Sequence, residues 1–310
     1  SPDFTMTVDT TAQAAPGAPD LLAADDTGSS NTDNLTSNLL PRLDVSLTGT
    51  GAVAGDRVQI RGPGGAFTVY GVAVLTPADI TAGTVTVQLA TILPEGQTAL
   101  TARVVDIAGN PGTDSGAFSI TVDTTDPSAP SSLVLDPTSD SGTVGDGLTN
   151  DTTPTINGGG ATPGGLVNVY VDGQLAGTAT ADANGNWSFT VPSGSPLADG
   201  AHSFTATQVD SAGNESTPSA PLNIVIDATA PGAPSITGFG VDSGVQGDNK
   251  TNATDLNLSG TAAPGATVDI YDGATLVGTV VADAQGNWTL TSTGALTANQ
   301  THSFTAKATD

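Results

Sequence analysis

Residues 118–125 read Phe-Ser-Ile-Thr-Val-Asp-Thr-Thr, and this stretch contains both a strand and a boundary. Apolar and polar side chains alternate as far as Val122, which is the period-2 pattern of a half-buried β-strand. Asp123 then begins a short segment, 123–130, that contains prolines; prolines restrict the backbone and favour a stiff, extended linker. The same order of alternating strand and proline-containing linker recurs at 222–234. The chain is therefore built from repeated units that each end in such a strand.

Three short motifs mark the repeats. They are Val/Ile-Asp-Thr/Ala-Thr at 8–11, 122–125 and 226–229, Asp-x-Ala-Gly-Asn at 106–110 and 210–214, and Gly-Asn-Trp at 185–187 and 286–288. We therefore divide the chain into an orphan last strand of a preceding repeat (1–8), a longer variant repeat (9–122), a second repeat (123–226) and a third repeat truncated before its last strand (227–310).

Turn residues and period-2 alternation predict seven short strands in the second repeat. We place them near 131–136, 153–157, 166–171, 175–181, 187–191, 202–209 and 220–226. The composition agrees, because Thr, Val, Ile, 39 Gly and 20 Pro predominate and long helical patterns are missing. The predicted fold class is all-β, with tandem seven-stranded immunoglobulin-like β-sandwiches arranged as an extended rod.

The charge of the chain limits which molecules it can bind, and its lack of cysteine limits how its domains can be stabilised. Acidic residues outnumber basic ones by 31 to 6, and the net charge of -25 repels nucleic acid and anionic membranes while favouring divalent cations. No apolar run approaches the roughly 20 residues needed to span a bilayer. The chain has no cysteine, so each domain depends on core packing, bound ions or both. We expect no nucleic-acid partner and no membrane insertion.

The VDTT-x-P linkers, D-x-AGN loops, GNW turns and DSG-x-x-GD loops resemble the bacterial Ig-like repeats of giant Gram-negative non-fimbrial adhesins and biofilm-associated proteins. The resemblance covers essentially the whole chain, and the middle of the first repeat, 70–88, resembles a sibling repeat type. It implies an extracellular protein at the bacterial surface, exported by type I secretion, with a rod of repeats rigidified by Ca2+. The implied partners are the neighbouring repeats and a host-cell or surface ligand, which a distal tip outside this chain would bind.

The loop after the first strand of each repeat is rich in Asp, Asn and Gly. Calcium takes six to eight oxygen ligands from carboxylates, amides and backbone carbonyls, and a glycine-interrupted acidic loop can supply several of them. The candidate ligands in these loops are Asp26 and Asp33 in the first repeat, Asp140, Asp146 and Asn150 in the second, and Asp242 and Asp248 in the third.

Sandwich topology predicts which loops meet. The loop after the first strand lies at the end next to the following linker, whereas the D-x-AGN loop lies at the end next to the preceding one. An interdomain site would then combine both loops with a linker aspartate. The predicted ligands are Asp26, Asp33, Asp123, Asp126, Asp210 and Asn214 at the first joint, Asp140, Asp146, Asp227 and Asp310 at the second, and Asp9, Asp106 and Asn110 at the equivalent places of the first repeat. The alternative is that these residues only form turns by bonding their own backbone.

Enzymatic activity is not expected. His202 and His302 occupy equivalent positions without a neighbouring nucleophile, and the acidic residues lie in solvent-prone loops rather than in a cleft. Trp187 and Trp288 alternate with Phe189 and Leu290, which predicts core packing; the alternative is a sugar-stacking surface.

The predicted function is a structural rod segment of an adhesin. One alternative is an Ig-like module that binds glycan or protein directly, and another is a set of accessory domains of a secreted hydrolase. We also expect head-to-tail strand exchange, because Phe4, Met6 and Val8 alternate like a last strand, whereas the third repeat lacks its own. Alternatively, residues 1–8 lie loosely over the first repeat.

Overall fold

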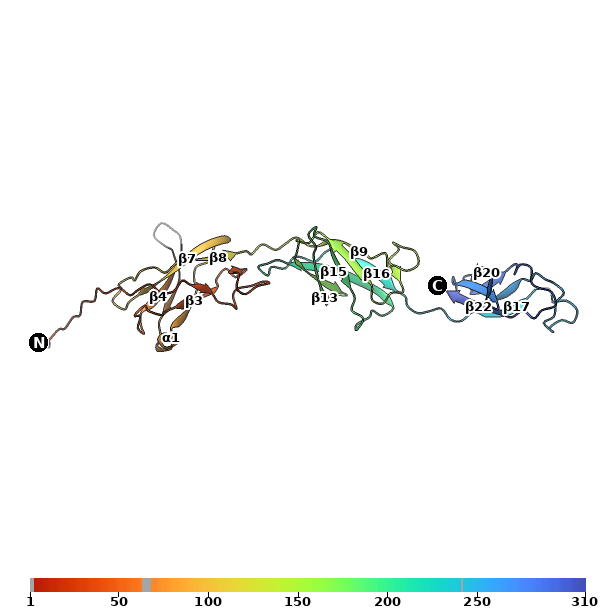
Figure 1. The fold of residues 1–310 in the computed structure, drawn as a ribbon, viewed down its shortest axis with the longest axis horizontal. Coiled ribbons are helices and arrows are strands. Elements are labelled where there is room, and N and C mark those ends of the chain that lie inside the picture. The colour runs from red at the N-terminus through yellow and green to blue at the C-terminus, as the bar shows by residue number, and fades with distance from the viewer. Residues whose placement is uncertain (1–2, 63–67, 241) are drawn as a thin grey trace. The chain divides into compact units, whose positions relative to one another are not determined.

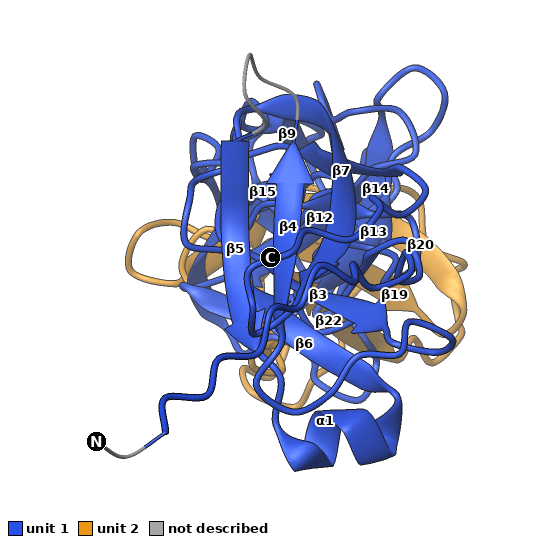
Figure 2. Ribbon diagram, turned by 90° about the vertical axis from the view of Figure 1, so that its left-hand side faces the viewer, with its two compact units in different colours: residues 1–227 blue, residues 228–310 orange. Residues whose placement is uncertain are grey.

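The structure is a computed structural model that describes residues 3–62, 68–240 and 242–310. The orphan strand predicted at 1–8 thus includes two residues, 1–2, that lie outside the described residues. The chain separates into two compact units, unit 1 (1–227) and unit 2 (228–310), which Figure 2 distinguishes by colour. Unit 1 contains repeats 1 and 2, each with its own hydrophobic core, and unit 2 contains repeat 3 with a third core.

The described part of repeat 1 forms two sheets and one short helix (Figure 1). The sheets have the strand orders β1-β3-β6 and β2-β8-β7-β4-β5, and they enclose the core between them. The elements are β1 (Asp20–Leu21), β2 (Leu35–Thr36), β3 (Arg42–Ser46), β4 (Arg57–Gly62), β5 (Thr68–Val74), α1 (Pro77–Ala82), β6 (Thr84–Gln88), β7 (Gly96–Val105) and β8 (Phe118–Val122).

The helix α1 is not part of the all-β prediction, but its local cause is clear. Thr76 and Asp79 form a reciprocal capping box, and Pro77 stands in the first turn, where its missing N–H costs nothing. Gly83 ends the helix in the left-handed region at φ 70°. These signals start and stop a six-residue helix within the variant middle of repeat 1.

Repeat 2 has eight strands rather than the predicted seven. Each of the seven predicted ranges overlaps a strand, and the additional one is the two-residue β10, which pairs in parallel with the last strand of the repeat. The sheets have the orders β14-β11-β9 and β10-β16-β15-β12-β13. The strands are β9 (Ser131–Leu135), β10 (Leu148–Thr149), β11 (Thr155–Gly159), β12 (Leu166–Val171), β13 (Gln174–Thr180), β14 (Trp187–Thr190), β15 (Gly200–Val209) and β16 (Leu222–Ile226).

The last strand completes the core of each of the first two repeats. In β16, Ile224 and Ile226 are 1% exposed, and the strand is antiparallel to β15 with Phe204 opposite Leu222. In β8, Ile120 and Val122 are equally buried. The alternation that identified these strands in the sequence therefore corresponds to one core face and one outer face.

The described residues of repeat 3 form six strands in two three-stranded sheets, β17-β18-β21 and β20-β19-β22. Its core is smaller than the other two, because several of its apolar side chains, including Phe304, are only partly buried. The strands are β17 (Ser235–Phe239), β18 (Leu258–Thr261), β19 (Thr267–Asp272), β20 (Thr275–Val281), β21 (Asn287–Leu290) and β22 (Phe304–Thr309). Among the described residues, no helix is long and apolar enough to cross a membrane.

Candidate metal site

The acidic loops of the three repeats are closed by the same hydrogen bonds. One carboxylate oxygen, Oδ2, accepts a backbone N–H of its own loop, and the distances are 3.2 Å from Asn34 to Asp26, 2.6 Å from Gly145 to Asp140 and 2.5 Å from Gly247 to Asp242. The residue that follows each of these aspartates carries a hydroxyl group, which accepts a backbone N–H at 2.8 Å in all three loops. The donor and acceptor pairs are Ser37 and Thr27, Asn150 and Ser141, and Asn252 and Ser243. The three loops therefore hold Asp26, Asp140 and Asp242 through the same kind of hydrogen bond, although the bond spans eight residues in repeat 1 and five in repeats 2 and 3.

The other oxygen of each of these aspartates is buried and unpartnered. Oδ1 of Asp26, Asp140 and Asp242 is shielded from solvent and has no hydrogen-bond partner among the described residues. Asp26 is only 6% exposed and Asp140 only 7%. Burial, reinforced by the neighbouring Asp33 carboxylate, raises the pKa of Asp26. A buried charge without a partner is costly, and a cation would offset that cost.

At the first joint, the acidic loop of repeat 1 contacts the D-x-AGN loop of repeat 2. The Thr27 hydroxyl donates to the Ala212 carbonyl. The backbone at Gly28 passes so close to repeat 2 that an added Cβ would lie 1.9 Å from the Ser211 carbonyl oxygen. Ala212 is fully buried, whereas its counterpart Ala108 in repeat 1 is exposed. Sandwich topology predicts that these two loops meet, and the structure brings them together.

The linker aspartate meets the same loop through its backbone. Nδ2 of Asn214 donates to the Asp123 carbonyl at 2.8 Å and to the Asp210 carboxylate at 2.9 Å. In repeat 1, Nδ2 of Asn110 donates to the Asp9 carbonyl at 3.0 Å, so the two D-x-AGN loops hold the preceding linker in one way. In each of these two repeats, the asparagine amide thus binds the backbone of the preceding linker.

The aspartates of the D-x-AGN loops are already engaged within their own loops. Asp210 Oδ1 accepts the backbone N–H groups of Ala212 and Asn214, each at 2.9 Å. Asp106 accepts from both the backbone and the side chain of Asn110, and these bonds lower the pKa of Asp106. For these two carboxylates the structure shows turn-forming contacts, which was the alternative interpretation of their motif.

The remaining predicted ligands are more exposed. Five of them accept the N–H two residues ahead, at 2.9–3.2 Å, in Asx turns: Asp9, Asp33, Asp123, Asp146 and Asp248. Asn150, Asp126, Asp227 and Asp310 are exposed, and Asp310 belongs to unit 2. In residues 3–62, 68–240 and 242–310, no three Asp, Glu, His or Cys side chains converge as a preformed metal cluster. A calcium ion bound here would need backbone carbonyl, amide or water oxygens beside one or two carboxylates.

Sequence reasoning missed Glu95. Its carboxylate accepts the backbone N–H of Thr124 at 3.1 Å and the Thr124 hydroxyl at 2.9 Å, and these bonds lower the pKa of Glu95. Glu95 therefore holds the start of the first linker from the side of repeat 1. The sequence contained one hint, because an acidic residue directly precedes the glycine that begins β7, and Asp199 does so for β15.

The two tryptophans are core residues, as predicted. Trp187 is 4% exposed and Trp288 is 2% exposed. Glycines opposite them provide the space for the indoles: a Cβ added at Gly158 would lie 2.2 Å from Trp187, and one at Gly260 would lie 2.3 Å from Trp288. Buried indoles cannot stack on a sugar, so the alternative role as a sugar-binding surface does not apply to either residue.

Tandem Ig-like sandwiches without disulfides define the class of this protein, and comparison with known families agrees. The model of the bacterial Ig-like domain matches residues 11–124, 127–228 and 231–310. The chain therefore belongs to the bacterial Ig-like domain family, and its predicted Ig-like fold is confirmed. Ig-like repeats of this type are non-enzymatic domains.

Several solved structures are similar to the chain, whereas no curated protein matches it. A biofilm-associated protein BSP domain is 21% identical, with a TM-score of 0.23, over 70% of this chain and 30% of that one. A tetra-tandem repeat from the extending region of a large adhesion protein is 23% identical over 95% of this chain and 73% of that one, with a TM-score of 0.26. A structure from a 1.5-MDa bacterial ice-binding adhesin is 21% identical over 96% and 98%, with a TM-score of 0.32. The chain thus spans less than a third of the first of these structures.

Proposed function

We propose that this chain is a structural segment of a bacterial surface adhesin, in which calcium at the joints between Ig-like repeats keeps the segment extended. The segment would project a distal adhesive tip from the cell. The observation that carries the proposal is the buried, unpartnered Oδ1 that recurs on Asp26, Asp140 and Asp242, one aspartate in the acidic loop of each repeat. Turn formation alone does not account for it, because a turn requires only the Oδ2 bond.

The location of these loops supports a role in stiffening. In repeat 1 the residue after Asp26 donates a hydrogen bond to repeat 2, so an ion held by Asp26 would fix the loop on which the inter-repeat contact depends. Asp26 and the nearby Asp33 are the carboxylates that would hold the ion, together with loop backbone oxygens. Calcium would neutralise the repulsion between the two carboxylates and order the loop against the D-x-AGN loop.

The rival function, direct binding of glycan, has less support. Its best candidate residues, Trp187 and Trp288, are buried. The net charge of -25 also disfavours anionic glycans as ligands, whereas it favours the accumulation of divalent cations.

Calorimetric calcium titration of the full chain and of Asp26→Asn tests this proposal. Asp3→Asn is the control, because it removes one charge from an exposed residue outside every strand. Asp26→Asn should reduce the number of bound calcium ions by one relative to the parent chain and the control. In chelator, Asp26→Asn should be at least as stable as the parent chain, because the substitution removes a buried, uncompensated charge.

When calcium is present, the parent chain should instead be more stable than Asp26→Asn. With dissociation constants of about 10⁻⁴ to 10⁻³ M, millimolar calcium stabilises the native state by about 0.4 to 1.4 kcal/mol per site, and Asp26→Asn should lack one such increment. Calcium binding with the same stoichiometry in all three proteins, or no binding at all, would contradict the proposed role of the acidic loop.

A further inference from the structure

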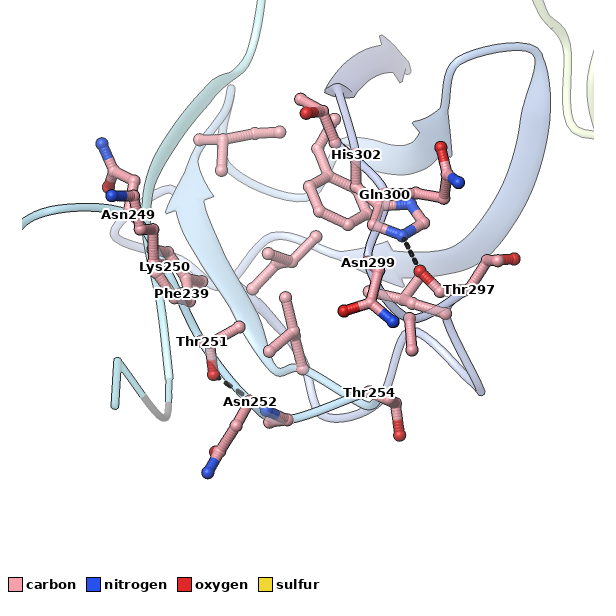
Figure 3. A pocket seen from close by; sticks show the side chains of 18 of the residues that line it. Phe239, Asn249, Lys250, Thr251, Asn252, Thr254, Thr297, Asn299, Gln300 and His302 are labelled. Carbon is pink, nitrogen blue, oxygen red and sulfur yellow. Dashed lines mark hydrogen bonds between the residues drawn. The ribbon is translucent and has the colours of Figure 1, made fainter. Parts of the chain in front are cut away.

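The six Lys and Arg side chains of this acidic chain are unevenly distributed. Repeat 2 has none of them. Repeat 3 has two: Lys250 lines a pocket (Figure 3), and Lys307 lies opposite Asp269 in the pairing of β22 with β19. The remaining four are arginines of repeat 1, and three of these belong to neighbouring strands of one sheet, at positions 57 and 61 in β4 and 103 in β7. Repeat 1 thus gathers most of the positive charge of the chain.

Two of these arginines lie on the outer face of the sheet, which points away from the core. In the pairing of β4 with β7, Gln59 is opposite Arg103. Arg57 lies on the same face as Gln59 because it is two residues away, whereas the residue between them is buried. The edge strand β5, which Figure 2 shows beside β4, extends this face with Val72 opposite Gln59 and Val74 opposite Arg57. Val72 is 48% exposed and Val74 is 57% exposed. We call these five residues the arginine face: Arg57, Gln59, Arg103, Val72 and Val74.

Neither Arg57 nor Arg103 has a carboxylate partner. The other two arginines of repeat 1 form ion pairs with aspartates, at 2.9 and 2.6 Å. In the part of the chain that the structure describes, no such pair involves Arg57 or Arg103, and Nε of Arg103 donates to the Gln59 side-chain oxygen at 2.9 Å. Two such arginines beside exposed valines, in a chain with 31 acidic residues, suit a partner that offers both negative charge and apolar contact.

The corresponding face of repeat 2 has the opposite charge. In the pairing of β12 with β15, Thr207 occupies the place that Arg103 has in repeat 1. The exposed carboxylate of Glu215 lies against this face, because it accepts hydrogen bonds from the hydroxyls of Thr207 at 2.6 Å and Tyr170 at 3.1 Å. The bond from Thr207 lowers the pKa of Glu215, so the carboxylate remains charged at neutral pH.

Apolar side chains lie on the same face as Glu215. Leu166, the counterpart of Arg57, is 45% exposed, and Leu175, which is opposite Tyr170, is 58% exposed. Repeat 1 precedes repeat 2 along the chain and does not cover Leu166, so this sheet face is accessible in a tandem array of repeats. We call this surface the glutamate face: Glu215, Tyr170, Leu166 and Leu175.

We propose that the arginine face of repeat 1 binds the glutamate face of repeat 2 in a second copy of this chain, so that neighbouring copies associate side by side. In this contact, Arg57 and Arg103 pair with Glu215. The valines of β5 pack on Leu166 and Leu175. The contact combines apolar burial with a charge complementarity that decides which faces meet, and repeat 2 has no Lys or Arg to repel the arginine face. A polyanion offers the valines no apolar contact, and the net charge of -25 repels it.

Sedimentation velocity of the full chain over a range of concentrations tests this proposal. Chelator is present throughout, so the result does not depend on calcium at the joints. Salt at about 0.15 M, where the Debye length is about 8 Å, screens the repulsion between copies that each carry a charge of -25 more than it screens charges in direct contact. Arg57→Glu/Arg103→Glu reverses the charge of the arginine face. Lys250→Glu/Lys307→Glu is its matched control, because it makes the same change of net charge in repeat 3.

The variant Leu166→Arg/Glu215→Gln tests the glutamate face. Arginine is the residue that repeat 1 has in place of Leu166, and glutamine can still accept the hydrogen bond from Thr207, so repeat 2 should remain folded, which scanning calorimetry checks. An equimolar mixture of this variant with Arg57→Glu/Arg103→Glu is the decisive sample, because in the mixture each face can meet a face of opposite charge.

The parent chain and the Lys250→Glu/Lys307→Glu control should show a sedimentation coefficient that rises with concentration, whereas each face variant alone should associate at least about tenfold more weakly. The mixture of the two face variants should associate more strongly than either variant alone. A parent chain that stays monomeric at every concentration, a control that loses as much association as the face variants, or a mixture that behaves like its separate components would overturn the proposal. Binding of dextran sulfate to a monomeric parent chain, lost in Arg57→Glu/Arg103→Glu, would also overturn it, because the arginine face would then bind a polyanion.

Discussion

The side chain of His202 links two loops of repeat 2 through both of its ring nitrogens. Nδ1 lies 2.8 Å from the Asp172 carboxylate, and Nε2 lies 2.9 Å from the Ala198 carbonyl. Because both neighbours are acceptors, the doubly protonated ring satisfies them best. Burial opposes that charge, but the bonds to Ala198 and Asp172 outweigh it and raise the pKa of His202. His302 has the same arrangement in repeat 3, with the Thr297 carbonyl and Asp272, and its pKa is also raised.

His202→Thr, which introduces the residue that repeat 1 has as Thr98, tests this link. A folded-state pKa above the unfolded value of about 6.5 contributes stability that is complete below that value and lost as pH rises through the folded pKa. The substitution should therefore lower the melting temperature of repeat 2 more at about pH 5 than at about pH 9. Scanning calorimetry in chelator measures this without a contribution from calcium. A loss of stability that is the same at both pH values would refute the protonated link.

The sequence could predict which residues lie in the candidate site, but it could not predict how deeply each of them is buried. The sequence identified Asp26 and Asp33 equally well as acidic loop residues, yet Asp26 is buried and Asp33 is exposed. The difference arises from loop closure, in which the Thr27 hydroxyl accepts the Ser37 N–H and folds the loop over Asp26. No local sequence pattern encodes the hydrogen bond between Ser37 and Thr27. The sequence could therefore predict the acidic loop as a candidate site, but it could not predict that Oδ1 of Asp26 is buried without a hydrogen-bond partner.

Among the structural elements, the contact of the two loops at the first joint depends on Gly28. Its φ of +94° favours glycine, and a Cβ would collide with the Ser211 carbonyl. Gly244 occupies the same place in the loop of repeat 3, with φ +83° and nothing within 4 Å. A side chain added at either glycine would therefore strain the backbone, but only one added at Gly28 would also collide with the Ser211 carbonyl.

Gly28→Ala should loosen the first joint, and Gly244→Ala should not. Both substitutions cost about 1 kcal/mol of local strain, but only the first displaces the loop at 210–214. Hydrogen exchange of the amides at 210–214 should be about tenfold faster in Gly28→Ala, equivalent to about 1.4 kcal/mol less opening free energy. Equal exchange in the two variants would show that this contact does not hold the joint.

Strand positions were predicted well where alternation is strong, as in β16 and β8, because their burial pattern is encoded residue by residue. The two-residue β10 could not be predicted, because its strand geometry comes from parallel pairing with β16, which lies far along the chain. The capping box of α1 at Thr76 and Asp79 was visible in the sequence. However, six residues are too few for the apolar periodicity that usually identifies a helix.

For the whole molecule, stability comes from the separate cores, whereas the proposed stiffness needs a different source. Each repeat has a separate hydrophobic core, so the repeats fold largely independently, as expected of a tandem array. The proposed stiffness would then come from the linkers and from the loops beside them. At the first joint these contacts are a few hydrogen bonds from Glu95, Asn214 and Thr27, which are modest individually. Calcium in the adjacent acidic loop would reinforce them.

Small-angle X-ray scattering of the full chain, in millimolar calcium and in excess chelator, tests the stiffening claim most directly. We expect a larger maximum dimension and a narrower distribution of distances with calcium, because bound ions would restrict bending at the joints. The double variant Asp26→Asn/Asp140→Asn should give the chelator-like profile under both conditions. A maximum dimension of the parent chain that is unchanged by calcium would contradict the account.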